Sequence, residues 1–234
     1  MPEQKHTLAQ SLLPEQMLPG EAIFCVQGLD FAYSRPLLRN VNLALYPGQS
    51  IGLSGPNGAG KTSLFRCLTG LEKPLKGTIS FLGETVEDEK GFRKLRRKVG
   101  FALQDAEDQL FFPEVLEDLE FGPLNLGANA EKARKDALWA LNLVGLAGYE
   151  NRLSHTLSGG EKKLCALAAI LAMKPLALLL DEPANALDEK STSRLIDILN
   201  NLNCAKIIIS HERDFLEKTC GDIVFLRDGT LENK

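Results

Sequence analysis

The chain has 234 residues, of which 44% are hydrophobic and 25% charged, and its formal net charge is −4. This length can bury the core of one large domain. An acidic balance lacks the basic footprint that nucleic-acid-binding proteins usually carry, so we expect no nucleic-acid partner. The five cysteines are scattered and follow neither a metal-ligand spacing nor a disulfide framework, which favours buried thiols in a reducing cytoplasm.

The N-terminal segment mixes charges with prolines and lacks the apolar stretch of a signal peptide, so residues 1–20 are predicted to be a loosely ordered tail. No apolar run reaches the roughly 20 residues that a membrane-spanning helix needs. The best candidate, Leu164–Met173, is far shorter and stops at Lys174 and Pro175. If the chain works at a membrane, we expect a partner to hold it there.

Strand and helix signals alternate along residues 21–234, which predicts an α/β domain with a mostly parallel sheet. Strands are expected at Ala22–Tyr33, Val41–Gly55, Gly77–Gly83, Val99–Leu103, Leu176–Leu180 and Lys206–Ser210. Pro47 and Gly48 turn the chain within the second of these strands. A helix is expected from Thr62 to Thr69, and Ile223–Leu226 followed by Arg227–Gly229 indicates a final hairpin.

The middle of the chain, from about residue 105 to residue 170, has a helical pattern without a convincing strand. Apolar residues recur there at helical spacing, at Ala133, Ala137, Leu138, Leu141 and Val144. We therefore predict a helical subdomain inserted into the α/β domain.

A phosphate-binding loop follows the second strand. Residues 55–62 read G-P-N-G-A-G-K-T, which matches G-x-x-x-x-G-K-[ST] between a strand and a helix. The glycines let backbone N–H groups converge on phosphate oxygens, and the helix N-terminus adds positive potential. Lys61 is expected to reach the β- and γ-phosphates of ATP, and the Thr62 hydroxyl to ligate Mg²⁺. The nucleotide-binding residues expected here are Asn57, Gly58, Gly60, Lys61, Thr62 and Ser63. A glycine-rich turn that fits the motif by chance is disfavoured by the strand and helix around it.

Two carboxylates end the apolar run Leu176–Leu180, in the form of a Walker B strand. Side chains alternate along a strand, so Asp181 and Glu182 are expected to take different roles. Asp181 suits Mg²⁺, and Glu182 suits polarisation of the attacking water. An acidic pair at a strand end is more often a turn or a helix cap, but the phosphate-binding loop favours catalysis.

Residues 157–161 read L-S-G-G-E before an apolar helix. Ser158 is a good N-cap, and Gly159 and Gly160 leave backbone N–H groups open at the start of the helix. Such a site can hold a γ-phosphate. Taken alone, the pentapeptide is better explained by a helix cap after a flexible loop, and the other two motifs favour the phosphate site.

Together these motifs resemble those of ABC-type ATPases over nearly the whole chain. The matching elements, in order, are Tyr33, the phosphate-binding loop, Gln104, L-S-G-G-E, L-L-L-D-E-P, Ala186-Leu187-Asp188 and His211. The resemblance implies a P-loop NTPase (RecA-like) core with an antiparallel β subdomain and an inserted α-helical subdomain. It also implies that ATP is held between the phosphate-binding loop of one subunit and the L-S-G-G-E segment of another. The partner would be a second copy or a related ATPase.

The resemblance assigns further roles one residue at a time. Tyr33 would stack on adenine, although a strand aromatic packed in the sheet is the simpler alternative. Gln104 would contact Mg²⁺ and the attacking water, and His211 would hold the γ-phosphate. Asp188 would lie at the dimer interface near the opposite nucleotide. His6 and His155 have no match and are expected to be solvated. Departures from the family pattern are Glu161 where Gln is commoner, Leu164 where Arg is usual, and Pro183-Ala184-Asn185 where Thr or Ser more typically follows the proline.

Residues 101–111, F-A-L-Q-D-A-E-D-Q-L-F, resemble the corresponding segment of energy-coupling-factor ATPases. In that group the segment forms a groove for coupling helices of a transmembrane partner, which carry an essential arginine. Asp105, Glu107 and Asp108 would suit such a cationic guest; a solvated acidic helix start is the alternative. The basic run Arg93–Lys98 is either a contact with anionic lipid headgroups or a solvated face.

We therefore expect an ATP-hydrolysing subunit, peripheral at the cytoplasmic face of the cell membrane, that powers uptake of a metal ion or a vitamin through transmembrane subunits. A soluble ABC ATPase acting on nucleic acid or ribosomes is the main alternative, disfavoured by the short chain and its acidic charge. An importer ATPase for another small solute is a second alternative.

Overall fold

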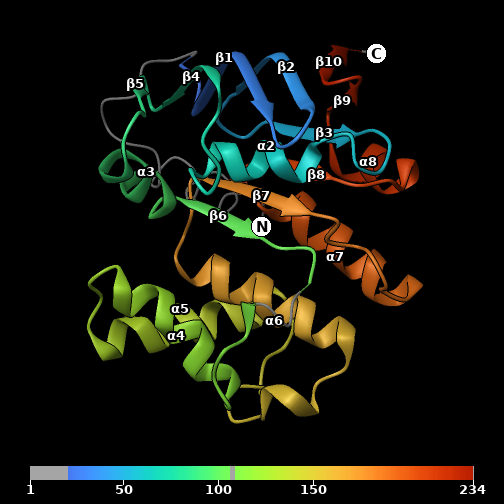
Figure 1. Ribbon diagram of the computed structural model, residues 1–234. Helices are drawn as coiled ribbons and strands as arrows, with labels where there is room; N and C mark the ends of the chain where they lie inside the picture. The colour runs from blue at the N-terminus through green and yellow to red at the C-terminus, as the bar shows by residue number, and fades with distance from the viewer. Residues whose placement is uncertain (1–20, 106–108, 234) are drawn as a thin grey trace.

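The computed structural model describes residues 21–105 and 109–233 (Figure 1). The expected tail at residues 1–20, with His6, lies outside the described residues, and so do Glu107 and Asp108 of the acidic segment.

A six-stranded sheet carries the strands that the sequence predicts to be buried, in the order β10-β9-β3-β8-β7-β6. Its members are β3 (Ser50–Ser54), β6 (Val99–Ala102), β7 (Ala177–Asp181), β8 (Ala205–Ile209), β9 (Asp222–Arg227) and β10 (Thr230–Asn233). All neighbours pair in parallel except the β9–β10 hairpin, which is antiparallel. Every residue of β7 and β8 is buried, as expected for central strands covered on both faces.

A second, antiparallel sheet has the order β2-β1-β4-β5. It contains β1 (Phe24–Ala32), β2 (Pro36–Leu45), β4 (Lys76–Phe81) and β5 (Glu84–Thr85). The stretch predicted as one turned strand, Val41–Gly55, is divided between the sheets: Pro47 and Gly48 lie between β2 and β3. The turn therefore marks a change of sheet, because the chain leaves the antiparallel layer there.

Among the described residues, four helices accompany the core: α2 (Lys61–Leu68), α3 (Glu89–Arg96), α7 (Glu189–Asn201) and α8 (Arg213–Thr219). Of these helices only α2 is expected by position, and neither β5, α3, α7 nor α8 is assigned from the sequence; α3 contains most of the basic run. The side chain of Asp88 caps α3 by accepting the N–H of Gly91 at 2.7 Å, which is why the helix begins there.

Three helices, α4 (Val115–Asn125), α5 (Ala130–Leu143) and α6 (Gly159–Ala172), lie between β6 and β7 in the chain, where the inserted helical subdomain is expected. A short 3₁₀ helix, Ser154–Thr156, precedes α6 and contains His155, which is exposed as expected. The apolar spacing falls on α5, although Leu138 is 38% exposed and Ala140, which the spacing did not include, lies on the buried face.

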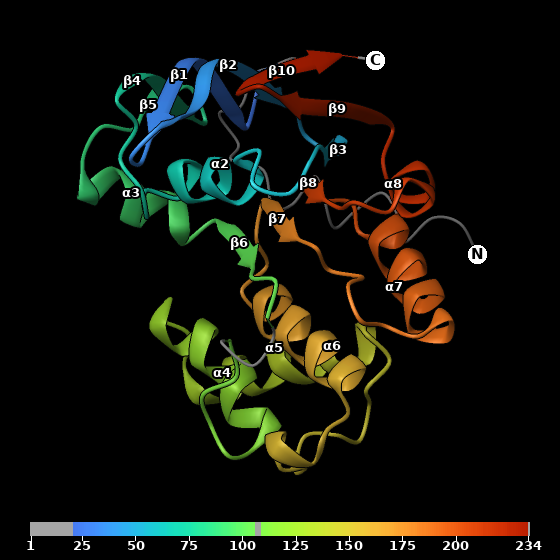
Figure 2. The ribbon, with the colours of Figure 1, turned by 45° about the vertical axis from the view of Figure 1, so that its right-hand side comes forward.

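Alternation along the central strands divides the interior into two cores. Leu179 faces a core shared with α2 and the antiparallel sheet, whereas Leu178 and Leu180 face a core shared with α4, α5 and α6. Figures 1 and 2 show α2 between the two sheets and the three inserted helices on the other side of the six-stranded sheet. The carboxyl ends of β3, β7 and β8 are thus left at one edge between these layers.

Candidate active site

A pocket of about 430 Å³ opens where β3, β7 and β8 end. It is lined by Leu37, Asn57, Gly58, Gly60, Lys61, Thr62, Ser63, Gln104, Asp181, Glu182, Asn185, Ile209 and His211. Parallel strands bring their carboxyl ends to the same edge, which is the usual ligand-binding edge of such sheets. The fold therefore gathers the predicted phosphate-binding loop, Gln104, both carboxylates and His211 around one space.

The phosphate-binding loop ends at Gly60, the N-cap of α2, whose φ of 106° is in the left-handed region. No side chain caps α2 and its first turn holds no acidic residue, so the first N–H groups of the helix are available to an anion. Lys61 is 8% exposed, and its Nζ donates to the carbonyl oxygens of Gly55 at 2.7 Å and Pro56 at 3.0 Å. The loop thus places the ammonium group of Lys61 and the first backbone N–H groups of α2 at the pocket.

Thr62 and Asp181 join α2 to β7: the Thr62 hydroxyl donates to Oδ2 of Asp181 at 2.7 Å. Burial raises the pKa of Asp181 above its ordinary value, and the charge of Glu182 acts in the same direction, against the Thr62 hydrogen bond and the Lys61 charge. A buried carboxylate and a hydroxyl are oxygen donors that suit Mg²⁺. Among the described residues no cluster of three or more His, Cys, Asp or Glu could hold a metal. This donor set fits a Mg²⁺ ion that takes its other ligands from phosphate and water.

Glu182 and His211 lie together at the ends of β7 and β8. The Nδ1 atom of His211 is 2.9 Å from Oε2 of Glu182, and the His211 N–H donates to the same oxygen at 3.4 Å. Glu182 has a φ of 47°, a conformation that non-glycine residues seldom adopt and that clusters at functional sites. Asp181 and Glu182 have different partners, in line with the different roles expected of them.

Tyr33 lies beyond the end of β1 and outside the pocket lining. Its side chain is 59% exposed, its hydroxyl donates to Oε1 of Glu72 at 3.0 Å, and its ring meets Phe31 edge to face at 4.8 Å. The ring is therefore on the surface and not packed within the sheet, which leaves it accessible to a base.

The L-S-G-G-E segment forms the start of α6 and also lies outside the pocket lining. Ser158 caps the helix by accepting the N–H of Glu161 at 3.3 Å, and Glu161 accepts the N–H of Ser158 at 2.8 Å, a reciprocal capping box. Gly159 is exposed, and an added Cβ would meet nothing within 4 Å. Ser158, Gly159 and Gly160 thus present an ordered helix N-terminus away from the nucleotide pocket of the same chain.

The structure accounts for Glu161, where the family pattern favours Gln. Its Oε1 accepts the Tyr149 hydroxyl at 2.6 Å, and Arg152 lies 3.7 Å from the same oxygen and 3.6 Å from the centre of the Tyr149 ring. These contacts, first the Tyr149 hydrogen bond, hold the pKa of Glu161 below its ordinary value. A carboxylate is therefore well placed here, at the positive end of α6.

Asp188 is the N-cap of α7 and is not in the pocket lining. Its Oδ1 accepts the N–H of Ser191 at 2.7 Å, and this hydrogen bond is the main reason why the pKa of Asp188 lies below its ordinary value. Its position within one chain is thus explained by helix capping, and its expected role at a dimer interface stays a prediction.

Sequence reasoning missed residues whose position depends on tertiary contacts. Leu37 and Asn185 line the nucleotide pocket, although neither was a candidate. Gln109 accepts the N–H of Leu103 at 3.0 Å and donates to the carbonyl of Phe101 at 2.9 Å, which ties the segment after Gln104 back to β6. For Asn185 the sequence did offer a clue, because it belongs to the stretch after Glu182 that departs from the family pattern.

Comparison with known proteins identifies the family. The sequence profile described as ABC transporter matches residues 38–185. A protein of Nitratidesulfovibrio vulgaris named as an ABC transporter ATP-binding protein is 46% identical over 91% of this chain and 79% of its own length. The chain therefore belongs to the ABC transporter family, as an ATP-binding, ATP-hydrolysing cassette of a transporter.

Two further similarities are more specific. The energy-coupling factor transporter ATP-binding protein EcfA of Methanothermobacter thermautotrophicus is 41% identical over 86% of this chain and 68% of its own. Among solved structures, cbiO1 from Clostridium perfringens, part of the ABC transporter complex cbiONQ, superimposes with a TM-score of 0.84. It is 32% identical, and the match covers 91% of this chain and 87% of that one.

Proposed function

We propose that this chain hydrolyses ATP in a dimer that drives an energy-coupling-factor-type transporter for a metal ion or a vitamin. The observation that carries the transporter type is the segment after Gln104, which resembles that group and leaves a large aromatic exposed. The segment connects Gln104, which lines the nucleotide pocket, to α4 of the helical layer, and its exposed aromatic side chain suits contact with a membrane partner.

The geometry of the pocket supports the chemistry that we assign to it. Lys61 and the open N–H groups of α2 bind the phosphates of ATP, and Glu182 accepts a proton from the attacking water. His211 holds the γ-phosphate and orients Glu182, and Gln104 contacts the attacking water. Mg²⁺, when bound by Thr62, Asp181 and Gln104, would neutralise charge that develops on the β- and γ-phosphates.

A second chain completes the site in this proposal. Ser158, Gly159, Gly160 and Asp188 lie outside the pocket of their own chain, although the family pattern assigns them to ATP. A solved dimer of an ATP-binding cassette bound to ADP and Pi is 26% identical to this chain, with a TM-score of 0.81. We therefore assign the first turn of α6 to the γ-phosphate held by the partner, which is a second copy or a related ATPase. Tyr33 is assigned to the adenine.

The surface assigned to the transmembrane subunits lies around Phe111, which is 72% exposed. Phe121 is 49% exposed and its ring lies 5.4 Å from that of Phe112. Exposed aromatic side chains, in and near a segment that also contains the carboxylate of Asp105, suit an amphipathic helix that carries an arginine. No helix among the described residues is long and apolar enough to cross a membrane. We place the protein at the cytoplasmic face of the membrane, held by its partners.

Purification from native membranes in mild detergent tests this proposal, with mass spectrometry of the retained proteins. Co-purification of a small membrane protein with a coupling arginine and a second, substrate-binding membrane protein would support it. Wild type is to be compared with Phe111→Ala, for which we expect reduced recovery of both. Recovery of repair or ribosomal proteins alone would favour the soluble alternative. A different membrane assembly would favour an importer for another solute.

A further inference from the structure

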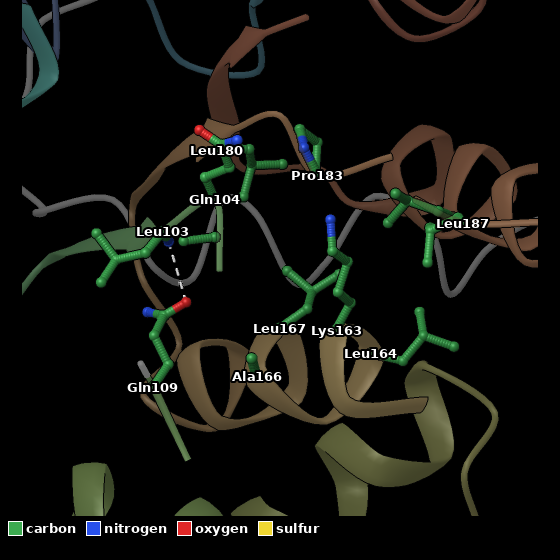
Figure 3. Close-up of a pocket in the computed structure, with 12 residues that line it drawn as sticks. Leu103, Gln104, Gln109, Lys163, Leu164, Ala166, Leu167, Leu180, Pro183 and Leu187 are labelled. Atoms are coloured by element: carbon green, nitrogen blue, oxygen red, sulfur yellow. Dashed lines mark hydrogen bonds between the residues drawn. The ribbon is translucent and has the colours of Figure 1, made fainter. Parts of the chain in front are cut away.

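Lys163 connects the helical layer to the loop that carries the catalytic carboxylate. It lies on α6, and its side chain rises from the helix toward the segment that follows β7 (Figure 3). Its Nζ donates to the backbone carbonyl of Asn185 and, at 3.5 Å, to that of Glu182. One ammonium group therefore bonds to both ends of a four-residue loop on another element.

This loop has a backbone that needs external support. Glu182 at the start of the loop has a φ of 47°, and Ala186 directly after the loop has a φ of 60°, although neither is a glycine. Within the loop the N–H of Asn185 donates to the carbonyl of Glu182 at 3.1 Å. Residues in the left-handed region persist when their surroundings hold them there. The Lys163 ammonium supplies such a constraint at the residue whose side chain must face the water.

The surroundings of Lys163 differ from those of a solvated surface lysine. With Gln104 and Pro183 it lines a small cavity of about 30 Å³ between α6 and the ends of β6 and β7 (Figure 3). Burial lowers the pKa of Lys163, while the charges of Asp105 and Glu182 oppose that shift. Partial burial of an ammonium group is unfavourable, and the two carbonyl hydrogen bonds and the nearby carboxylates offset part of that cost.

The helix that carries Lys163 begins at the segment assigned to the partner's ATP. Ser158 and Glu161 fix the first turn of α6 by their capping box, and Lys163 follows in the next turn. A helix moves as a rigid unit over so short a distance. A shift of Gly159 or Gly160 is therefore transmitted to the bonds that Lys163 makes with the carboxylate loop.

We propose that Lys163 is a positioning residue that couples the two nucleotide sites of the dimer, through the contact of α6 with one ATP and of the carboxylate loop with the other. This inference rests on the proposed composite sites. It assigns Lys163 no contact with nucleotide: the residue sets the position of Glu182 in response to the position of α6.

The first test compares Lys163→Met and Lys163→Arg with wild type in steady-state ATP hydrolysis. We expect Lys163→Met to lower kcat about 10- to 100-fold, because a catalytic group displaced by about 1 Å loses that much. ATP binding by the isolated chain should stay within about twofold, since no phosphate contact is removed. Arg can reach both carbonyls and should restore most of kcat. Lys135→Met, at an exposed lysine of α5, is the control.

The decisive test uses mixed dimers of two differently tagged copies, one of which carries Glu182→Gln. Only the other copy then hydrolyses ATP. Lys163→Met in the hydrolysing copy should lower the rate about 10-fold or more, whereas the same change in the Glu182→Gln copy should leave it nearly unchanged. A role in folding or dimer stability alone would lower the rate equally from either copy, and that result would overturn the inference.

Two variants separate the role of Lys163 from the catalytic role of Glu182. If wild type hydrolyses ATP, Glu182→Gln abolishes hydrolysis and Lys163→Met retains full kcat, the role of Lys163 is wrong and the catalytic assignment stands. If Glu182→Gln retains hydrolysis, the catalytic assignment itself fails.

Discussion

The imidazole of His211 holds the carboxylate of Glu182 at the edge where β7 and β8 end, with Nδ1 at 2.9 Å from Oε2. The two residues are 29 positions apart in the chain, and the parallel pairing of β7 with β8 brings them together. Glu182 is 9% exposed, so few water molecules compete for its oxygens. This pair fixes the direction of the carboxylate toward the nucleotide pocket.

The first prediction concerns this pair. His211→Ala should lower kcat about 100-fold, the usual effect of losing one group that stabilises the transition state. The KM for ATP should change much less, because Lys61 and α2 remain to bind the phosphates. Steady-state hydrolysis over a range of ATP concentrations measures both constants. An unchanged kcat would show that Glu182 needs no help from His211.

The second prediction concerns the capping box of α6. Glu161→Ala removes the acceptor for the Ser158 N–H and for the Tyr149 hydroxyl, and should destabilise the fold by about 1 kcal/mol. Glu161→Gln keeps one oxygen, which can accept the Ser158 N–H, and its Nε2 can donate to the Tyr149 oxygen, so it should destabilise the fold less than Ala does. Urea unfolding of the two variants gives the difference. Equal destabilisation by Gln and Ala would mean that the one acceptor retained by Gln does not support α6, and would contradict the capping box as the source of the stabilisation.

The third prediction concerns Asp136, a buried carboxylate of α5 that accepts hydrogen bonds from Lys132 at 2.8 Å and from Lys174. Burial alone would raise its pKa, but the two lysines outweigh burial and leave the pKa below its ordinary value of 3.8. Asp136→Asn should therefore lower the free energy of unfolding at neutral pH, by about 2 kcal/mol.

The sign of the pH dependence follows from linkage. A carboxyl whose pKa is lowered by folding contributes stability above its ordinary pKa and loses that contribution as pH falls through the folded value. The difference between wild type and Asp136→Asn should thus be constant from pH 5 to 7 and shrink below about pH 4. Asp197→Asn, at an exposed carboxylate of α7, is the control. A difference that grows on acidification would contradict the assignment.

The site residues predicted from the sequence and gathered by the fold share one property. Each lies at or shortly after the end of a strand whose buried apolar run can be recognised in the sequence; they are Lys61, Asp181, Glu182 and His211. Because such strands pair in parallel, their ends had to meet. Asn185 could not be placed in this way, since its position depends on the turn after Glu182 and on the contact of that turn with Lys163.

Elements with weak local signals were less predictable. Two-residue β5 and eight-residue α3 are too short for periodicity to reveal. Leu138 fits the helical spacing of α5, yet the face that packs against α4 and α6 contains Ala137, Ala140 and Leu141. Small residues on that face allow close helix packing, and hydrophobicity alone does not report it. The assignments of Gly159 and Asp188 involve a second chain and that of Tyr33 involves the adenine of a bound nucleotide, so these three stay predictions.

The measurement that tests the central claim most directly is the ATP-dependent mass of Glu182→Gln, determined by light scattering alongside its hydrolysis rate. We predict that the variant hydrolyses ATP at least about 100-fold more slowly than wild type. It should be monomeric without nucleotide and dimeric with ATP and Mg²⁺, while Lys61→Ala stays monomeric in both conditions. A Glu182→Gln variant that turns over ATP normally, or that stays monomeric with ATP, would contradict the composite site in which Glu182 is the base.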